Sequence, residues 1–243
     1  MMEDPLIALG HAMARFTELT MGAEGDEPVP ACADWRVADL VAHLGNVHRW
    51  AAATVLSGQR IADEPASRPT EPLEEWYAGI ATALLAALQA VDGDEPTPNF
   101  AQIDEVAAFW SRRQLHETTI HAVDLAQALG RPEYGWGITD DVAADGVSEL
   151  LRVFLRRMVA RGRPPVVRGP IDLVATDIDR VWTLVPGENP LQPPMIVSSE
   201  ADAVGVARGT VSELYLALWN RLPSDRLDLT GAAVDFFAGP RVP

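Results

Sequence analysis

Residues 103–130 read IDEVAAFWSRRQLHETTIHAVDLAQALG. Apolar residues recur in this segment every three or four positions, and Gly130 and Pro132 follow, so the pattern predicts a long helix ending near residue 130. Glu117 and His121 lie four positions apart, about 40° from each other around such a helix, and therefore project from one face. This spacing alone is compatible with an ion pair, with a chance pairing in the core, or with half of a metal site.

Four further segments have the same helical periodicity, and loops rich in Pro, Gly and Asp separate them. These segments are residues 6–20, 35–56, 73–91 and 140–162. Long helices joined by such loops predict an up-and-down helical bundle.

The pattern of the sequence changes after residue 164. Short runs rich in β-branched residues, bounded by Asp, Gly and Pro, predict strands at residues 171–176, 180–186, 195–199, 203–207 and 226–231. A further helix is predicted over residues 209–223, opened by a capping box between Thr210 and Glu213. We therefore expect a helical domain over residues 1–164 and a small α+β domain over residues 165–243.

The charge and composition exclude several classes of function. The chain has 35 acidic and 19 basic residues, a formal net charge of −16, so nucleic acid and anionic membranes would be repelled. All of the basic residues are arginine, which excludes lysine-based chemistry such as Schiff-base formation. Cys32 is the only cysteine, so an internal disulfide and a multi-cysteine metal site are both excluded. The sequence shows neither a signal-peptide pattern nor an apolar run of membrane-spanning length, which predicts a cytoplasmic protein.

A tight metal site needs a third ligand from another helix, and the second predicted helix offers His43 and His48. These two residues are five positions apart, about 140° around the helix, so they do not easily bind one ion together. His43 has apolar neighbours and is expected near the apolar face, whereas His48 precedes Arg49 and is expected nearer the rim. We therefore favour His43, which with Glu117 and His121 gives a His/Glu/His set with open positions for water or substrate.

The segments that carry these residues resemble a known family. WRVADLVAHLGNVHRWAAA (residues 35–53) and WSRRQLHETTIHAVDLAQALG (residues 110–130) are similar to the mycothiol-dependent maleylpyruvate isomerase family, within the wider DinB-like four-helix bundles. VARGTVSELYLALWNRLPSDRLDLTG (residues 206–231) resembles the small C-terminal domain of that family. The resemblance covers nearly the whole chain and implies a DinB-like up-and-down four-helix bundle followed by a small α+β C-terminal domain.

The resemblance also implies a site and a reaction. In that family a divalent metal, usually zinc, is bound by a histidine of the second helix and a Glu…His pair of the fourth, which His43, Glu117 and His121 match. The implied cofactor is mycothiol, whose metal-held thiolate adds to the cis double bond of an unsaturated diacid. Rotation about the resulting single bond and elimination then give the trans product. Arg221, in LWNRLP, is the candidate for an arginine that contacts substrate or thiol, and a cation at a helix C-terminus is the alternative.

Three classes of function remain open at this stage. The first is a metal- and mycothiol-dependent isomerase or S-transferase that acts on a small molecule. The second is a metal-dependent hydrolase that uses activated water, and the third is a non-catalytic protein that binds metal or a partner. Cys32 is expected to be a buried loop residue, so the thiol is expected to come from mycothiol. Arg113 is a candidate ion-pair partner of Glu117, and Asp124 either orients a histidine ring or is a surface aspartate.

Overall fold

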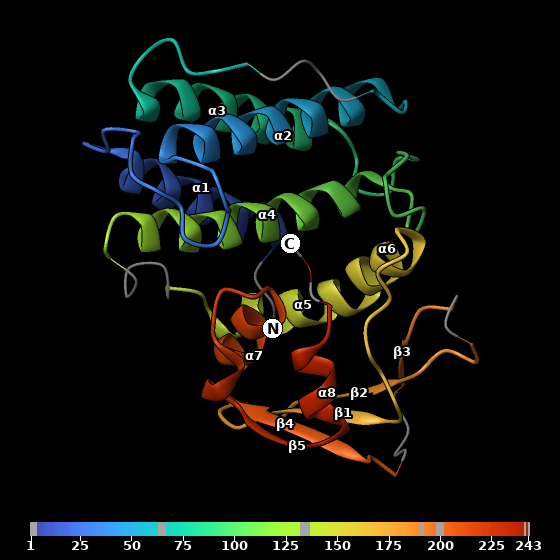
Figure 1. Ribbon diagram of the computed structural model, residues 1–243. Helices are drawn as coiled ribbons and strands as arrows, with labels where there is room; N and C mark the ends of the chain where they lie inside the picture. The colour runs from blue at the N-terminus through green and yellow to red at the C-terminus, as the bar shows by residue number, and fades with distance from the viewer. Residues whose placement is uncertain are drawn as a thin grey trace. The chain divides into compact units, whose positions relative to one another are not determined.

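In a computed structural model of the chain, the described residues are 4–62, 67–131, 137–189, 192–197, 202–240 and 242. The chain divides into two compact units, Met1–Gly137 and Ile138–Pro243, which are described separately below (Figure 1). Among the described residues, none of the helices combines the length and the apolar character that crossing a bilayer requires.

The first unit is a four-helix bundle. Its helices are α1 (Pro5–Thr20), α2 (Val37–Ser57), α3 (Leu73–Ala90) and α4 (Ala107–Ala128). α1 and α2 each pack against both α3 and α4, so the four helices surround one shared core (Figure 1). The predicted four-helix bundle is therefore confirmed, and α4 ends two residues before Gly130, whose φ of 68° is the left-handed conformation typical of a helix end.

The directions of the helices differ from those of a simple up-and-down bundle, because α2 and α3 run the same way. Ala38 and Leu73, near the starts of the two helices, both lie beside Gly25. Further along, Gly45 of α2 lies against the ring of Trp76 of α3. The connection over residues 58–72 allows this arrangement, since fifteen residues can extend over roughly 50 Å while α2 is only about 32 Å long.

α2 and α4 begin in the same way, and these are the helices that carry the candidate site. An isolated β-bridge precedes each of them, and the first N–H groups of each helix donate to the loop before it, which satisfies groups that lack a partner within the helix. The bridges are Pro28–Arg36 and Pro96–Val106, and the helix-start bonds are Val37 N to Glu27 O (2.9 Å) and Ala107 N to Glu95 O (3.0 Å). Each helix start is thereby fixed to its own loop.

The second unit is a mixed sheet with helices packed against it. The sheet has the order β3-β2-β1-β4-β5, in which β1 and β4 are parallel and all other neighbours are antiparallel. The strands are β1 (Ile171–Ala175), β2 (Val181–Val185), β3 (Met195–Val197), β4 (Gly205–Gly209) and β5 (Asp228–Gly231). All five strands were predicted, and the last two residues of the predicted run 195–199 lie outside the described residues.

The helical elements of this unit are α5 (Asp140–Glu149), a π-helical turn η2 (Leu150–Phe154), α6 (Leu155–Ala160), α7 (Val211–Leu218), a 3-10 turn η3 (Ser224–Arg226) and α8 (Ala232–Ala238). α7 and α8 pack on the sheet, and the predicted capping box of Thr210 and Glu213 opens α7. α8 was not predicted from the sequence.

The boundary between the units lies between Gly137 and Ile138, which differs from the boundary after residue 164 expected from the sequence. The cause is α5, which packs on α7. Gly146 of α5 lies against the Tyr215 ring, and Trp182 Nε1 donates to Ser148 Oγ at 2.9 Å. Helical periodicity shows that a segment has an apolar face but not which element packs against that face. The sequence pattern therefore grouped residues 140–162 with the helical bundle, whereas α5 packs in the second unit.

Candidate metal centre

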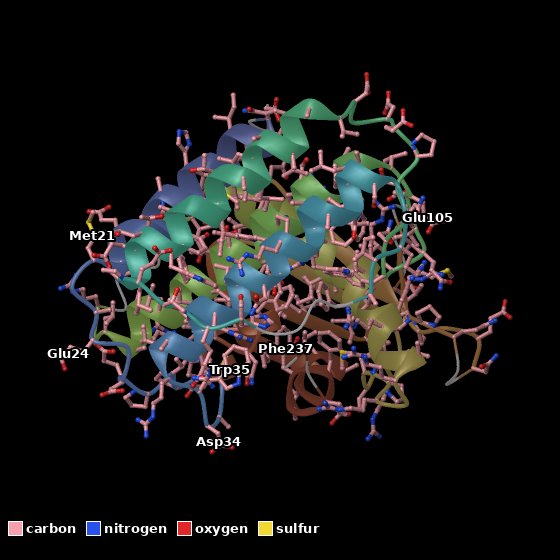
Figure 2. All side chains as sticks on the ribbon, turned by 90° about the horizontal axis from the view of Figure 1, so that it is seen from above. Met21, Glu24, Asp34, Trp35, Glu105 and Phe237 are labelled. Carbon is pink, nitrogen blue, oxygen red and sulfur yellow. The ribbon has the colours of Figure 1, made fainter. Side chains whose placement is uncertain are left out.

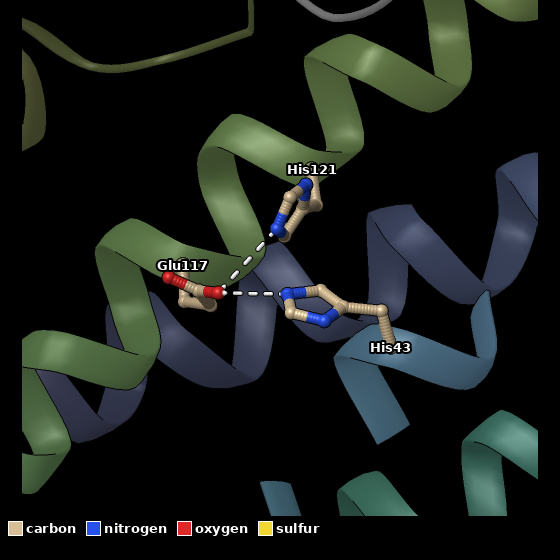
Figure 3. A group of neighbouring side chains, drawn as sticks. All are labelled: His43, Glu117 and His121. Atoms are coloured by element: carbon tan, nitrogen blue, oxygen red, sulfur yellow. Dashed lines mark hydrogen bonds and ion pairs between the residues drawn. The ribbon is translucent and has the colours of Figure 1, made fainter. Parts of the chain in front are cut away.

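Three side chains from α2 and α4 converge on one point of the bundle (Figure 3). His43 Nε2 and His121 Nε2 each lie 3.4 Å from Glu117 Oε1. One ligand atom from each of the three residues falls within 4.8 Å of the other two. The sequence placed Glu117 and His121 on one helical face, and the structure brings His43 from another helix to the same place.

The neighbours of these residues fix which atoms face the centre. Arg113 Nη2 donates to Glu117 Oε2 at 2.6 Å, which leaves Oε1 directed at the two imidazoles. His121 Nδ1 lies 2.9 Å from Asp124 Oδ2, so Nε2 is the ring nitrogen on the side of Glu117. The ion pair of Arg113 with Glu117 is thus confirmed. Asp124 is buried, with 0% exposure, and orients a ring rather than lying on the surface.

The charged groups around the centre shift one another's pKa values. Burial acts to raise the pKa of Glu117, but Arg113 and the two histidines outweigh it and hold that pKa well below its usual value. Burial likewise acts to lower the pKa of His121, yet the hydrogen bonds to Asp124 and Glu117 outweigh it and raise that pKa to about 9. His121 is therefore protonated at neutral pH, and a cation that binds its Nε2 would have to displace that proton.

The donor set fits a divalent metal ion. Two imidazole nitrogens and one carboxylate oxygen are the ligands of catalytic zinc sites, which keep a further position open. For bonds of about 2.0 Å, the ligands of a tetrahedral ion are roughly 3.3 Å apart. The two histidine–Glu117 separations at this centre are 3.4 Å, close to this spacing, and all three ligand atoms lie within 4.8 Å of one another.

The exposures of the two α2 histidines are the reverse of the expectation. The side chain of His43 is 36% exposed, and His48 is 0% exposed. The expectation used neighbours in sequence, but residues one position apart lie about 100° apart on a helix. The residues three and four positions from His48 share its face, and Leu44, Gly45 and Ala51 among them are buried. His48 is thus buried in the core, and no role was predicted for it from the sequence.

The loop before α2 supplies two contacts to the centre that the sequence reasoning did not predict. Trp35, labelled in Figure 2, has its ring centroid 4.9 Å from that of His43. Cys32 Sγ lies 3.9 Å from Asp124 Oδ2, the oxygen that also bonds His121. Cys32 is partly exposed rather than buried, so that expectation was wrong.

Arg221, the predicted substrate-contacting arginine, lies just after α7 in the second unit and is 8% exposed. Its Nη1 donates to the carbonyl oxygen of Trp219, the C-cap residue of α7, at 2.8 Å. This bond is the one expected of a cation at a helix C-terminus, the alternative raised from the sequence.

Comparison with known proteins identifies relatives of both units. The family model of the mycothiol maleylpyruvate isomerase N-terminal domain matches residues 6–126, and that of the MDMPI C-terminal domain matches residues 141–236. A crystal structure of the mycothiol-dependent maleylpyruvate isomerase has 13% identity and a TM-score of 0.60. A histidine-to-alanine mutant of a mycothiol-dependent maleylpyruvate isomerase has 14% identity and a TM-score of 0.62. Both alignments cover 99% of this chain and 94% of the other, and at these identities they show a shared fold. No curated protein matches the chain.

Proposed function

This chain belongs to the mycothiol-dependent maleylpyruvate isomerase family, a family of enzymes, and on that basis we propose that it is a metal-dependent enzyme that uses mycothiol. The observation that carries the proposal is the convergence of His43, Glu117 and His121, whose ligand atoms lie within 4.8 Å of one another. The ion proposed is zinc, because two imidazoles and a carboxylate with an open position are its usual catalytic ligands. We place the reaction in the cytoplasm, where thiols are kept reduced.

The residues at the centre have separate tasks. His43 and His121 would hold the ion through Nε2, and Glu117 would hold it through Oε1. Arg113 keeps Oε2 of that carboxylate away from the ion, and Asp124 keeps the His121 ring in the orientation required. A zinc ion bound there would supply positive charge that lowers the pKa of a thiol and makes it a thiolate at neutral pH.

The thiol is proposed to come from mycothiol rather than from the chain. Cys32 is the only cysteine, and its sulfur lies 3.9 Å from the Asp124 carboxylate. A carboxylate opposes a second negative charge beside it, so this position is unfavourable for a reactive thiolate. The reaction proposed is cis–trans isomerisation of an unsaturated diacid, the class to which the substrate named for the two related structures belongs, or transfer of the thiol to a similar acceptor.

Arg221 is proposed to contact the substrate or the thiol. Its positive charge suits a carboxylate or the enolate that forms when a thiolate adds to the double bond. Replacing Arg221 by Met should lower kcat/KM at least tenfold while metal content stays unchanged. If the substitution lowers only the stability of the second unit and leaves kcat/KM unchanged, the guanidinium instead stabilises the C-terminal end of α7, where it donates to the Trp219 carbonyl.

Metal analysis of purified protein tests the proposal directly. After incubation with zinc and dialysis, the wild type should retain about one ion per chain and release protons on binding, because His121 must give up its proton. His43→Ala and His121→Ala should lose the ion. His11→Ala is the matched control, since that histidine is exposed on α1 and lies outside the cluster. A wild type that retains no zinc would overturn the proposal.

Activity assays then separate the three classes of function. Turnover of a cis-unsaturated diacid that requires both zinc and mycothiol supports the isomerase. Hydrolysis that requires zinc alone would favour the hydrolase, in which the metal activates water. Stable zinc binding without turnover in either assay would favour the non-catalytic alternative.

A further inference from the structure

A second group of polar side chains lies in the bundle core, about one helical turn from the metal cluster. His48 Nδ1 lies 2.7 Å from Gln114 Oε1, and His48 Nε2 lies 3.1 Å from the Tyr77 hydroxyl. Thr118 Oγ1 donates to the Gln114 main-chain carbonyl at 2.7 Å. All four residues have 0% exposure. This group, the His48 network, joins α2, α3 and α4.

The protons of the His48 network can be assigned by counting donors and acceptors. Burial lowers the pKa of His48 to about 4, so the ring is neutral at pH 7 and carries one N–H. Because Gln114 Oε1 can only accept, His48 Nδ1 carries the ring proton and donates to it. His48 Nε2 is then the acceptor, and the Tyr77 hydroxyl donates to it.

Gln114 completes this assignment. Its Nε2 is buried and has no hydrogen-bond partner within the described part of the chain. The amide oxygen is thus the end of Gln114 that faces the ring, and proton donation runs in one direction, from Tyr77 to His48 and from His48 to Gln114.

The network joins the two helices that carry the metal ligands. His48 follows His43 by five residues on α2, and Gln114 precedes Glu117 by three on α4. A shift of one helix past the other by a single residue moves its side chains about 1.5 Å. Metal ligands must be held to within about 0.5 Å. The bond between His48 and Gln114 excludes such shifts close to the point where the ligands meet.

Stability alone does not explain why these polar groups are buried. Replacing a buried polar network by apolar side chains of similar volume is often neutral or stabilising, because burial removes polar groups from water. A network whose members bond in one direction does, however, select one register among several that an apolar core would tolerate. This selection is useful where two helices must present ligands to one ion.

We propose that His48 is a positioning residue, which through Gln114 and Tyr77 holds α2 and α4 in the register at which His43, Glu117 and His121 can bind one metal ion. The inference rests on the proposed function, because it concerns the geometry of the same centre. His48 itself lies outside the cluster of His43, Glu117 and His121.

Zinc affinity, measured by competition with a chromogenic chelator, tests the inference in His48→Leu and His48→Asn. Leu fills the space without a hydrogen bond, and its zinc affinity should fall at least tenfold. Asn places an amide where Nδ1 stood and can still bond Gln114, so its affinity should stay within about threefold of the wild type. The visible spectrum of the cobalt-substituted protein should change with His48→Leu and stay close to the wild type with His48→Asn.

Thr54→Val is the matched control, because Thr54 is also buried on α2 and its hydroxyl, among the residues that the structure describes, bonds only the Trp50 carbonyl of the same helix. Its zinc affinity should equal that of the wild type. Zinc binding by the wild type with undiminished affinity in His48→Leu would overturn the inference and leave the proposed function intact. Failure of the wild type to bind zinc would instead overturn the proposed function. Loss of folding in both His48 variants would also overturn the inference, since the network would then belong to the stability of the fold.

Discussion

Lowering the pH should destabilise the first unit through His48. Tyr77 of α3 and Gln114 of α4 contact the ring, while Glu117, His121 and His43 act on it through their charges. Burial is the dominant effect and lowers the pKa of His48 from 6.5 to about 4. The native structure therefore excludes the proton that the unfolded chain binds readily below pH 6.5.

The sign and size of the effect follow from linkage between proton binding and folding. Because the folded-state pKa is depressed, the stabilisation is complete above pH 6.5 and is lost progressively as the pH falls toward 4. Each unit by which the pH falls inside this window lowers the free energy of unfolding by up to about 1.4 kcal/mol. Between pH 7 and pH 5, the free energy of unfolding should therefore fall by about 2 kcal/mol on account of His48 alone.

Urea denaturation at pH 7, 6 and 5, with a chelator present, would measure this loss in the wild type and in His48→Asn. Other groups titrate in both proteins. His121, whose pKa is raised to about 9, stabilises the fold fully below pH 6.5 and loses that contribution as the pH rises toward 9. Subtracting the loss of stability of His48→Asn from that of the wild type removes such shared contributions. Equal losses of stability between pH 7 and pH 5 would refute the assignment of His48 as a buried, neutral ring.

Four further substitutions at single positions have definite expected outcomes. Asp124→Asn should weaken zinc binding by about 10- to 100-fold in a competition titration, because the carboxylate that orients His121 is lost; unchanged affinity would contradict its role. Cys32→Ser should leave zinc content and mycothiol-dependent turnover unchanged, and loss of turnover would show that the chain supplies the thiol. Gly45→Ala should lower the free energy of unfolding by about 1–3 kcal/mol, because its Cβ would come within 2.4 Å of the Trp76 ring. Gly79→Ala, which meets nothing within 4 Å, should be neutral or stabilising by up to about 1 kcal/mol, and equal effects at the two glycines would contradict the packing.

The parts of the fold that follow from local rules could be predicted from the sequence. The helices of the first unit and the strands of the second have clear periodicity and breakers, and the capping box at Thr210 fixes the start of α7. Glu117 and His121 could be paired because four positions on a helix always share a face. The partner packed against α5 and the parallel course of α2 and α3 depend on contacts between distant segments, which no local rule supplies.

The candidate site, too, could be predicted only where local rules apply. Its two α4 ligands follow from spacing, whereas the choice of His43 rested partly on an expectation of burial that proved to be reversed. The resemblance to the isomerase family supported the choice on separate grounds. The His48 network was missed because its members lie on three helices and each alone resembles an ordinary core or surface residue. Only the distances of 2.7 Å and 3.1 Å around the ring reveal it.

Most residues of the candidate site lie on α4, a helix that is polar and yet covered by its neighbours. A helix covered by neighbours on most sides is normally apolar, and a polar helix normally faces solvent. α4 packs against all three other helices of the bundle, yet Arg113, Gln114, Thr118, His121 and Asp124 are all buried on it. These side chains bond to one another, to Glu117, to the main chain of α4 or to His48 of α2. Such burial is costly unless the groups are paired, so their concentration on one central helix indicates that α4 is built around the candidate metal centre rather than around the core alone.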